Sequence, residues 1–242
     1  QFIKFCPCCQ KRDQMEKVIH SYPFTVSSYG LGETVSVDYI ESLIPDSEGN
    51  NMIIVIVDNF SRFTDLYPAK STNAMGAAHA LLSFSGRYAT PSCFYTDKGR
   101  SFANDIVKGL TESLGANHHF IPAYSKEQNA IVERQNKEVM RHLRNIVFDK
   151  RVVTSWSKYL PIVQRIINTS INSATGITPA EAVFPNGITL DRSLVSDVSP
   201  IYMSSYISEL QQAQARIIAI AEQNLRDKDR HHVDNYKKER TE

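Results

Sequence analysis

The sequence predicts an α/β protein in which a mixed β-sheet is flanked by helices. Three strand patterns follow one another between residues 34 and 70, and helical and strand patterns then alternate as far as residue 122. Consecutive strands favour an antiparallel meander, and the alternation that follows adds further strands with helices covering the sheet. With 242 residues, the chain is long enough for one sizeable core and smaller attachments.

Each of the first three strands has its own signature. In TVSVDYIES, which begins at Thr34, apolar and polar residues alternate as they do along a half-buried strand. The segment NNMIIVIVDNF carries an apolar, largely β-branched run over 52–57 that is typical of a buried central strand, and a turn at 49–51 precedes it. SRFTDLYPAK, residues 61–70, completes the meander.

Helices and short strands alternate after the meander. Apolar residues at helical spacing cover 72–89, and a short strand then ends at Asp97. An amphipathic helix over 101–115 closes with a glycine, and a final short strand covers 117–122. A long charged helix is expected over 126–148.

The C-terminal third is predicted to be helical. SWSKYLPIVQRIINTSIN, residues 155–172, predicts a second long helix, and Thr178-Pro179 marks a helix start in the loop that follows. Residues 204–230 form an amphipathic helix with a charged end that we expect to fray. The order β-β-β-α-β-α-β-α leaves a small set of topologies, among them the ribonuclease H-like fold.

Composition excludes few classes of partner. The formal net charge is only +1, so any basic surface for nucleic acid has to be local. The longest apolar run, Met52 to Val57, is far shorter than a membrane span, and the first residues lack a signal-peptide pattern, so no membrane partner is expected. Because the chain opens in mid-motif without a Met, we expect it to be a piece of a longer chain.

Three of the four cysteines crowd together as Cys6, Cys8 and Cys9. Adjacent cysteines make a poor disulfide framework, which favours a reducing compartment. Cys6-x-x-Cys9 is half of a tetrahedral zinc site, and His20 is the one close candidate for a further ligand. Free thiols in a frayed end explain the same pattern, and the residues alone leave both interpretations open.

Acidic residues occur at awkward positions in the strand patterns. Asp38 lies inside the first strand, and Asp97 ends the fourth. Charge near a sheet interior is costly unless it is paired or metal-bound, and a divalent cation such as Mg²⁺ relieves the repulsion between two neighbouring carboxylates. Taken singly, each acid is more often solvent-facing or paired with a lysine. Asp58 is assigned to that ordinary class, because Arg62 is close enough in sequence to satisfy it.

Three acids carry a family resemblance. Asp38 in VSVDYI, Asp97 in FYTDKGRSF and Glu133 in AYSKEQNAIVERQNKEV resemble the D,D-35-E signature of retroviral and retrotransposon integrases, in the style of the gypsy type. Residues 98–132 supply the 35-residue interval. The segments IIVIVDNFSRF and NSATGITPAEAVF resemble the family too, and the similarity covers most of residues 1–190.

The chain also departs from the family pattern. Ala130 stands where the family usually has a glycine three residues before the glutamate, and Lys126-Glu127 stands where a Pro-Gln pair is common. An alanine lacks the conformational freedom of glycine, so we expect reduced mobility of the active-site loop.

The resemblance implies both fold and chemistry. It implies a ribonuclease H-like core in which Asp38, Asp97 and Glu133 hold two Mg²⁺ (or Mn²⁺) ions, with Asp38 bridging both. The implied reactions are 3′-end processing of element DNA by water, followed by strand transfer of the new 3′-hydroxyl to target DNA. The resemblance further implies that Cys6 and Cys9 are zinc ligands of an N-terminal domain whose two histidines lie upstream of residue 1.

The helix that carries Glu133 is predicted to hold DNA. Lys137, Arg141 and Arg144 share its face at helical spacing, and a row of cations beside a metal site binds phosphates without reading sequence. Lys137 also matches a DNA-contacting lysine of the family. The alternative is a solvated face on which Lys137 and Arg141 pair with Glu138 or other acids.

The loop before this helix is expected to touch the terminal nucleotides through Tyr124 and Asn129. Paired His118 and His119 invite a metal interpretation, but adjacent residues of a strand point to opposite faces, so we interpret both as structural. Trp156 is expected to pack in the core or at a subunit interface.

Three segments are predicted: the end of a zinc-binding domain with its linker (1–22), an integrase catalytic core (23–190), and a C-terminal linker helix with a charged tail (191–242). The expected partners are DNA, both element ends and target, and further copies of the chain in a homo-multimer. The expected location is the nucleus, after a cytoplasmic particle stage.

Two other functions compete: a non-catalytic, domesticated DNA- or protein-binding module, and a nuclease of RNA–DNA hybrids. The intact acids oppose the first, and the 35-residue interval and ATGITPAEAVF oppose the second.

Overall fold

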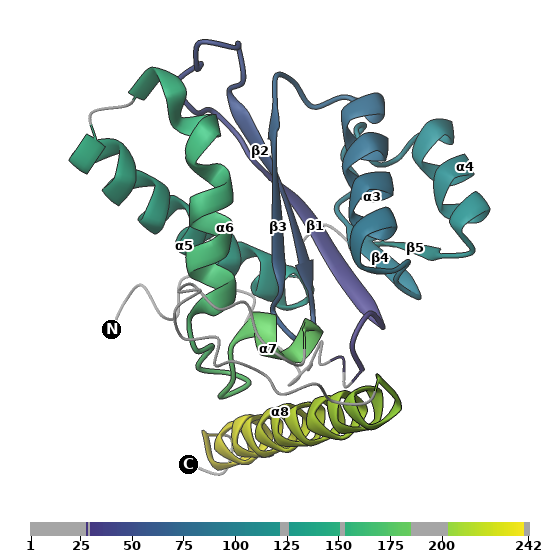
Figure 1. Ribbon diagram of the computed structural model, residues 1–242. Helices are drawn as coiled ribbons and strands as arrows, with labels where there is room; N and C mark the ends of the chain where they lie inside the picture. Colours follow the sequence, from purple (N-terminus) through teal and green to yellow (C-terminus); the bar gives the residue numbers. More distant parts are fainter. Residues whose placement is uncertain (1–27, 29, 122–125, 151–152, 185–202, 240–242) are drawn as a thin grey trace, which may run out of the picture.

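The computed structural model describes residues 28, 30–121, 126–150, 153–184 and 203–239 (Figure 1). Five strands form one mixed sheet in the order β3-β2-β1-β4-β5. The strands are β1 (Thr34–Ile40), β2 (Met52–Asp58), β3 (Thr64–Ala69), β4 (Cys93–Thr96) and β5 (Asn117–Phe120). The meander β1-β2-β3 is antiparallel, whereas β4 pairs in parallel with both β1 and β5. The predicted mixed sheet flanked by helices is therefore confirmed.

The β2 strand explains why its sequence is apolar without interruption. Side chains of successive strand residues point to opposite faces of the sheet. Ile54 and Ile56 face one hydrophobic cluster, and Ile53, Val55 and Val57 face another. Helices cover both faces of the sheet, so every residue from 53 to 57 is removed from water.

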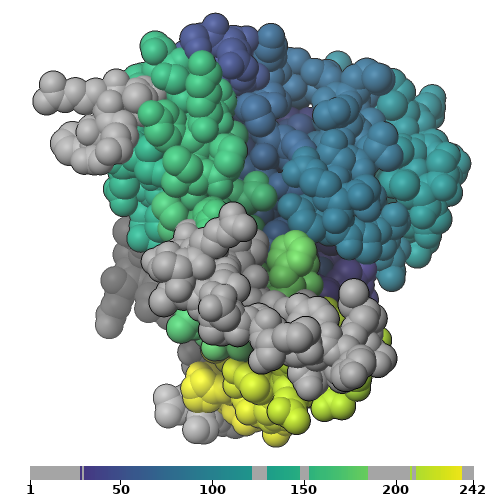
Figure 2. All heavy atoms as spheres, viewed as in Figure 1, coloured from purple at the N-terminus to yellow at the C-terminus, as the bar shows by residue number. Residues whose placement is uncertain are grey.

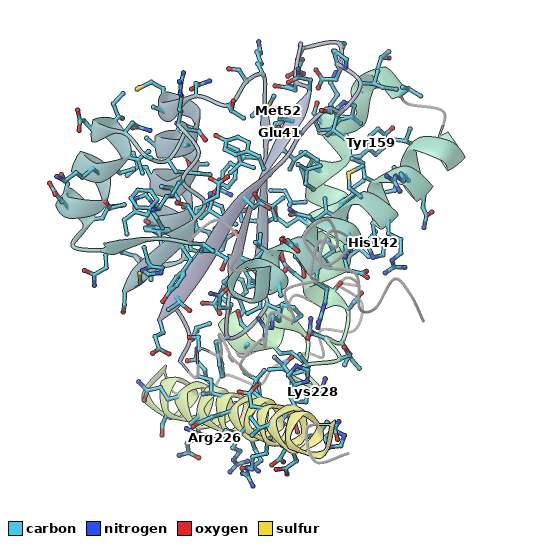
Figure 3. All side chains as sticks on the ribbon, turned by 180° about the vertical axis from the view of Figure 1, so that it is seen from behind. Glu41, Met52, His142, Tyr159, Arg226 and Lys228 are labelled. Atoms are coloured by element: carbon cyan, nitrogen blue, oxygen red, sulfur yellow. The ribbon has the colours of Figure 1, made fainter. Side chains whose placement is uncertain are left out.

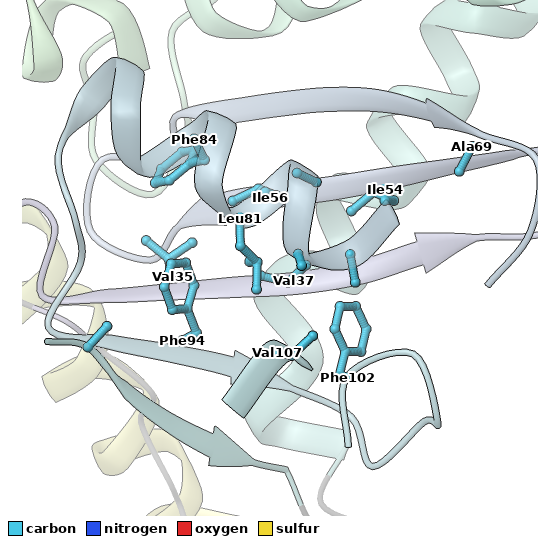
Figure 4. Close-up of a cluster of buried hydrophobic side chains, with 14 residues drawn as sticks. Val35, Val37, Ile54, Ile56, Ala69, Leu81, Phe84, Phe94, Phe102 and Val107 are labelled. Carbon is cyan, nitrogen blue, oxygen red and sulfur yellow. The ribbon is translucent and has the colours of Figure 1, made fainter. Parts of the chain in front are cut away.

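One face of the sheet is covered by α3 (Ala74–Tyr88) and α4 (Asp105–Leu114). The side chain of Asn73 caps α3 by accepting a hydrogen bond from the Gly76 N–H (2.7 Å), and Asn104 caps α4 in the same way. Leu81 and Phe84 of α3 enter the cluster between helix and sheet (Figure 4). These two helices match the helical patterns predicted over 72–89 and 101–115.

The other face is covered by α5 (Lys126–Lys150) and α6 (Leu160–Thr169), which a 3₁₀ segment, η1 (Val153–Tyr159), connects. The prediction of one continuous helix over 155–172 is therefore wrong. Pro161 lies in the first turn of α6, where its missing N–H is tolerated, so a new helix starts there rather than continuing. Trp156 is buried in the cluster beneath α5 and α6, which confirms core packing.

The C-terminal part consists of α7 (Pro179–Val183) and α8 (Met203–Glu239). Thr178 caps α7 in a capping box with Glu181, as the Thr-Pro pair predicts. The helix continues through most of the charged segment to Glu239, beyond the predicted end near residue 230. Ion pairs at helical spacing, such as Arg226–Glu222 at 2.6 Å, support this charged stretch.

The long helix α8 lies across one end of the core (Figures 1 and 2). Ala221 and Leu225 pack on Phe60, and the Asn224 side-chain amide donates to the Thr175 carbonyl at 2.7 Å. Lys228, labelled in Figure 3, donates from the same helix to the Ser173 carbonyl. The amphipathic helix thus packs on the core. In the described part of the chain, neither α8 nor any other helix is long and apolar enough to cross a membrane.

The predicted segment boundaries at residues 22 and 190 stay predictions. Residues 1–22 lie outside the described residues, and so do both boundaries. The elements from β1 to α7 fall within the predicted core of 23–190, and α8 falls within the third segment.

Candidate active site

The sheet brings two of the predicted acids together. Asp38 lies near the carboxyl end of β1, and Asp97 directly follows β4. These strands are parallel neighbours with Ser36 opposite Tyr95, and this register, continued by two residues, places Asp97 level with Asp38. The carboxyl ends of adjacent parallel strands thus carry one carboxylate each.

The helix α5 crosses the same region and supplies the third acid. Val132, Val139 and Leu143 form its buried side, at spacings that keep them on one helical face. Glu133 lies on another side and is exposed. Asn136, one turn further on, shares its direction and reaches the sheet.

Asp38 is held by two hydrogen bonds. Its Oδ1 accepts from the backbone N–H of Tyr39, and its Oδ2 accepts from the side-chain amide of Asn136, each at 2.9 Å. Asn136 was not identified from the sequence as a site residue. Its spacing of three residues from Glu133, on the same helical face, is the signal that points to it.

The electrostatics of Asp38 reflect burial among like charges. Burial, with a smaller contribution from the negative charges of Asp97 and Glu133, raises the pKa of its carboxyl to about 6, and the hydrogen bonds from Tyr39 and Asn136 oppose the rise. The three acids therefore interact, although they come from two strands and a helix. A destabilised carboxylate of this kind is a common mark of a functional site.

Asp97 is exposed, and its carboxylate is oriented by the turn that follows. The backbone N–H of Gly99 donates to Oδ1 of Asp97 at 2.9 Å. A Cβ at residue 99 would lie 2.9 Å from the same oxygen, closer than real Cβ contacts allow. A side chain at this position would therefore displace the Asp97 carboxylate from the backbone N–H that orients it.

Two adjoining hollows surround these acids, and Tyr39 lines both. The first, of about 430 Å³, contains Asp38 and Asp97 together with Glu41 and Arg100. Glu41 follows the end of β1 beside Met52 at the start of β2 (Figure 3). The second hollow measures about 500 Å³ and has as its lining Tyr39, Ile40, Glu133, Asn136, Lys137, Met140 and Arg144.

The predicted row of cations divides in two. Lys137 and Arg144 are exposed and line the second hollow with Glu133. Arg141 instead pairs with Glu138, with Nε 3.0 Å from the carboxylate oxygen. The alternative of a paired, solvated side chain thus describes Arg141, while Lys137 and Arg144 have the placement expected of phosphate ligands. Their role in binding DNA stays a prediction.

The loop residues expected at the DNA terminus are only partly described. Tyr124 lies outside the described residues, and Asn129 is placed in the first turns of α5 without a description of its side chain. Ala130 is half-buried within the same helix. At this position alanine favours helix over loop, since it has a higher helix propensity than the glycine usual in the family.

The donor set around Asp38 suits a hard divalent cation. Carboxylate oxygens are the ligands that Mg²⁺ prefers, and a cation would compensate the negative charge of Asp38, which burial disfavours. As the side chains lie here, the described residues contain no group of three or more His, Cys, Asp or Glu that would hold one ion. Glu133 faces the second hollow and has to turn toward Asp38 for all three acids to share a cation. Cys6 and Cys9, the predicted zinc ligands, lie outside the described residues.

Asp58 is buried rather than solvent-facing, and its hydrogen-bond partners differ from the expected Arg62. It accepts hydrogen bonds from the backbone and hydroxyl of Ser61, both at 2.7 Å, and from the Gly32 N–H at 2.9 Å. Burial raises the pKa of Asp58, and these bonds and the charge of Arg62 oppose the rise. Arg62 thus acts through its charge, while the hydrogen bonds come from the turn around it.

The strand order and the helices on both faces of the sheet define a ribonuclease H-like fold. Solved structures have the same fold. Because their sequence identities to this chain are low, the similarity is evidence for the fold alone. The catalytic core domain of BIV integrase superposes with a TM-score of 0.51 at 19% identity, covering 63% of this chain and 93% of that one. A chain of the simian T-cell lymphotropic virus intasome, in complex with PP2A regulatory subunit B56 gamma, gives 0.61 at 19% identity, with coverages of 82% and 68%. The HTLV-2 integrase catalytic core in complex with magnesium, in its trimeric form, gives 0.53 at 17% identity, with coverages of 62% and 94%.

Sequence relatives point the same way and include polyproteins of retroviruses and of a transposon. The chain is 28% identical to the Pro-Pol polyprotein of simian foamy virus type 1 over 171 residues, 67% of this chain. It is 28% identical over 187 residues, 75% of this chain, to the Gag-Pol polyprotein of feline leukemia virus. It is 28% identical over 188 residues, 76% of this chain, to the Tf2-3 polyprotein of Schizosaccharomyces pombe. The chain spans 11–14% of the length of these polyproteins, and no protein-family model matches it.

Proposed function

We propose that this chain is the catalytic part of a retroelement integrase, which processes the 3′ ends of element DNA and joins them to target DNA. One observation supports the proposal: Asp38 and Asp97 lie level near the carboxyl ends of adjacent parallel strands, and Asn136 of α5 is bonded to Asp38, while Glu133 of the same helix lines the adjoining hollow. The similarity to Pol polyproteins and the fold of retroviral integrase cores support it.

The proposal assigns metal binding to Asp38, Asp97 and Glu133. Two Mg²⁺ or Mn²⁺ ions bound there would activate the attacking oxygen and stabilise the leaving oxygen of a phosphodiester. The HTLV-2 integrase core, which shares the fold, was solved in complex with magnesium. Oxygen-only ligation by three carboxylates is consistent with either ion.

Neighbouring groups orient the acids of the site and supply positive charge beside them. The Tyr39 N–H and the Asn136 amide fix both oxygens of Asp38, and the Gly99 N–H fixes one oxygen of Asp97, so each carboxylate is oriented before any ion binds. Lys137 and Arg144 line the hollow beside Glu133, where they bind the phosphates of a DNA strand. No covalent link between enzyme and DNA is required.

The remaining assignments concern the whole protein. We assign Cys6 and Cys9 to a zinc site completed by residues upstream, and we infer that the protein works as a homo-multimer on DNA in the nucleus. The relatives with this fold include an intasome and a trimeric core. We also propose that the retroelement is of the gypsy type.

The test is a gel assay of the full-length integrase on blunt duplexes that carry the element's own terminal sequence. With Mn²⁺ or Mg²⁺ we expect shortened 3′ ends and joined products. Asp38→Asn and Glu133→Gln should abolish both, because each removes a carboxylate at the centre. Glu138→Gln is the matched control: it neutralises an acid on α5 that lies outside both hollows and should retain activity.

Two outcomes would count against the proposal. Full activity of the Asp38→Asn or Glu133→Gln protein would remove these acids from the mechanism. Absence of any product from the native protein would favour the competing function, a non-catalytic module that binds DNA or protein.

A further inference from the structure

Thr96, the residue before Asp97, makes hydrogen bonds on two sides. It is the last residue of β4, and its side chain is fully buried. Its hydroxyl donates to the carbonyl oxygen of Asp97 at 2.9 Å and lies 2.8 Å from Nε2 of His118 on β5. Its own carbonyl accepts from the Ile121 N–H at 2.8 Å. The peptide that leads into Asp97 is thereby tied to the neighbouring strand.

The direction of these bonds follows from the chemistry of the hydroxyl. A threonine hydroxyl has one hydrogen to donate and two lone pairs that accept. Because its hydrogen goes to the Asp97 carbonyl, the bond with His118 runs from the imidazole Nε2–H to the hydroxyl oxygen. A residue at 118 that accepted from Thr96 would draw this hydrogen away from Asp97.

The two adjacent histidines have different surroundings. The ring of His118 contacts the Phe120 ring in a tilted arrangement, with centroids 4.4 Å apart, and this contact supports the imidazole in the orientation that reaches Thr96. His119 points to the other face of the strand and makes a tilted contact with Tyr95, with centroids 4.8 Å apart. Only His118 is therefore connected to the backbone of Asp97.

Asp97 depends on this connection because little else restrains it. Its carboxylate is exposed, and within the described part of the chain the hydrogen bond that orients it comes from the Gly99 N–H. The position of the carboxylate then follows the backbone from residue 96 to residue 99. We propose that His118 is a positioning residue for Asp97 and acts through the hydroxyl of Thr96. This inference rests on the proposed function, since it takes Asp97 to bind a metal ion.

The experiment measures Mn²⁺ binding to the intact chain by titration, followed by water-proton relaxation and by the rise in unfolding temperature. His118→Leu removes the donor and should raise the half-saturating Mn²⁺ concentration about tenfold, the lower end of the effect of residues that orient metal ligands. His118→Gln restores an N–H donor and should bind within a few-fold of native. His119→Leu, the matched control on the other face of the strand, should bind like the native protein.

A second variant keeps the test independent of how well His118→Leu folds. Thr96→Val preserves size and removes the hydroxyl, and it should weaken Mn²⁺ binding to the same degree. Combining it with His118→Leu should add no further loss, because both changes break one chain of contacts. If His118 only stabilises the fold, the losses of Mn²⁺ binding caused by the two substitutions should instead add in the double variant.

The outcomes separate the two proposals. If native protein binds Mn²⁺ and the His118→Leu and Thr96→Val proteins bind it equally well, the positioning role is wrong and the proposed function stands. Equal weakening by His119→Leu also overturns the positioning role. If native protein binds no Mn²⁺, both proposals fail.

Discussion

Replacing Asp38 by asparagine should stabilise the protein when no divalent cation is present. Asp38 is half-buried, and burial with the charges of Asp97 and Glu133 raises its pKa from 3.8 to about 6. Above pH 6 the folded protein thus holds an ion that its surroundings disfavour. An amide of the same shape has no charge to bury, so the substitution removes this cost.

The magnitude follows from the shift in pKa. A rise of about two pH units corresponds to about 3 kcal/mol, and partial exposure of the side chain reduces this to about 2 kcal/mol. For a chain of this size, about 2 kcal/mol raises the unfolding temperature by about 4–8 °C. The geometry accommodates the amide, because Asn136 Oδ1 is buried and has no hydrogen-bond partner in the described part of the chain. Rotation of the Asn136 amide lets this oxygen accept from the new side chain.

The pH dependence identifies the cause. Between pH 3.8 and about 6 the folded state binds more protons at Asp38 than the unfolded state, so native stability falls relative to the variant as pH rises through this window. Urea unfolding in EDTA measures the difference in unfolding free energy between the Asp38→Asn variant and the native protein. This gap should be near zero at about pH 4 and reach its full size well above pH 6. Saturating Mg²⁺ should stabilise the native protein alone and narrow or reverse the gap.

Asp46→Asn is the matched control. Burial alone would raise the pKa of Asp46, but hydrogen bonds from Ser157 and Asn50 outweigh burial and lower the pKa to about 2. This acid stabilises the fold when it is ionised, so its replacement should destabilise the protein above about pH 4. The reasoning is refuted if Asp38→Asn lowers stability at about pH 8, or if its effect is the same at pH 4 and pH 8.

Three further predictions concern the same region. Gly99→Ala should leave the unfolding temperature within a few degrees of native but weaken Mn²⁺ binding, because its Cβ would displace Oδ1 of Asp97; unchanged titration curves would contradict this. Lys137→Ala should weaken binding of DNA of any sequence and reduce the slope of log K against log salt concentration by about 0.9. Arg141→Ala, which breaks an ion pair with Glu138, should change this slope less. Equal slopes of the two variants in fluorescence anisotropy would contradict different roles for Lys137 and Arg141. Ala130→Gly should cost about 0.5–1 kcal/mol of stability in urea unfolding, since residue 130 is helical, and a gain in stability would show that glycine is preferred there.

The sequence predicted those features that depend on local pattern. The β-branched run of β2 and the alternation in β1 determine how the strands lie, so the local pattern was sufficient to assign Asp38 to a strand. Asp97 followed from its position at the end of a strand pattern. Pro161 was visible in the sequence too, but its effect as the start of a new helix was missed.

What was missed depends on contacts between distant segments. The bond from Asn136 to Asp38 joins residues 98 positions apart, and no local pattern reports it. The same holds for the link between His118 and Thr96, which requires the pairing of β4 and β5. Arg141 illustrates a different difficulty: its pairing with Glu138 and its placement on a DNA-facing row were equally compatible with helical spacing.

The attachment of α8 constrains how the length of this chain can vary. With 37 residues and a rise of about 1.5 Å per residue, the helix is about 55 Å long, and its described contacts with the core include those of Ile218, Ala221, Leu225 and Lys228. Each residue added after these contacts rotates the following part of the helix by about 100°. Insertions or deletions of four or seven residues therefore change the direction in which the helix end faces by only about 40° or about 20°, whereas changes of one or two residues turn it by about 100° or more.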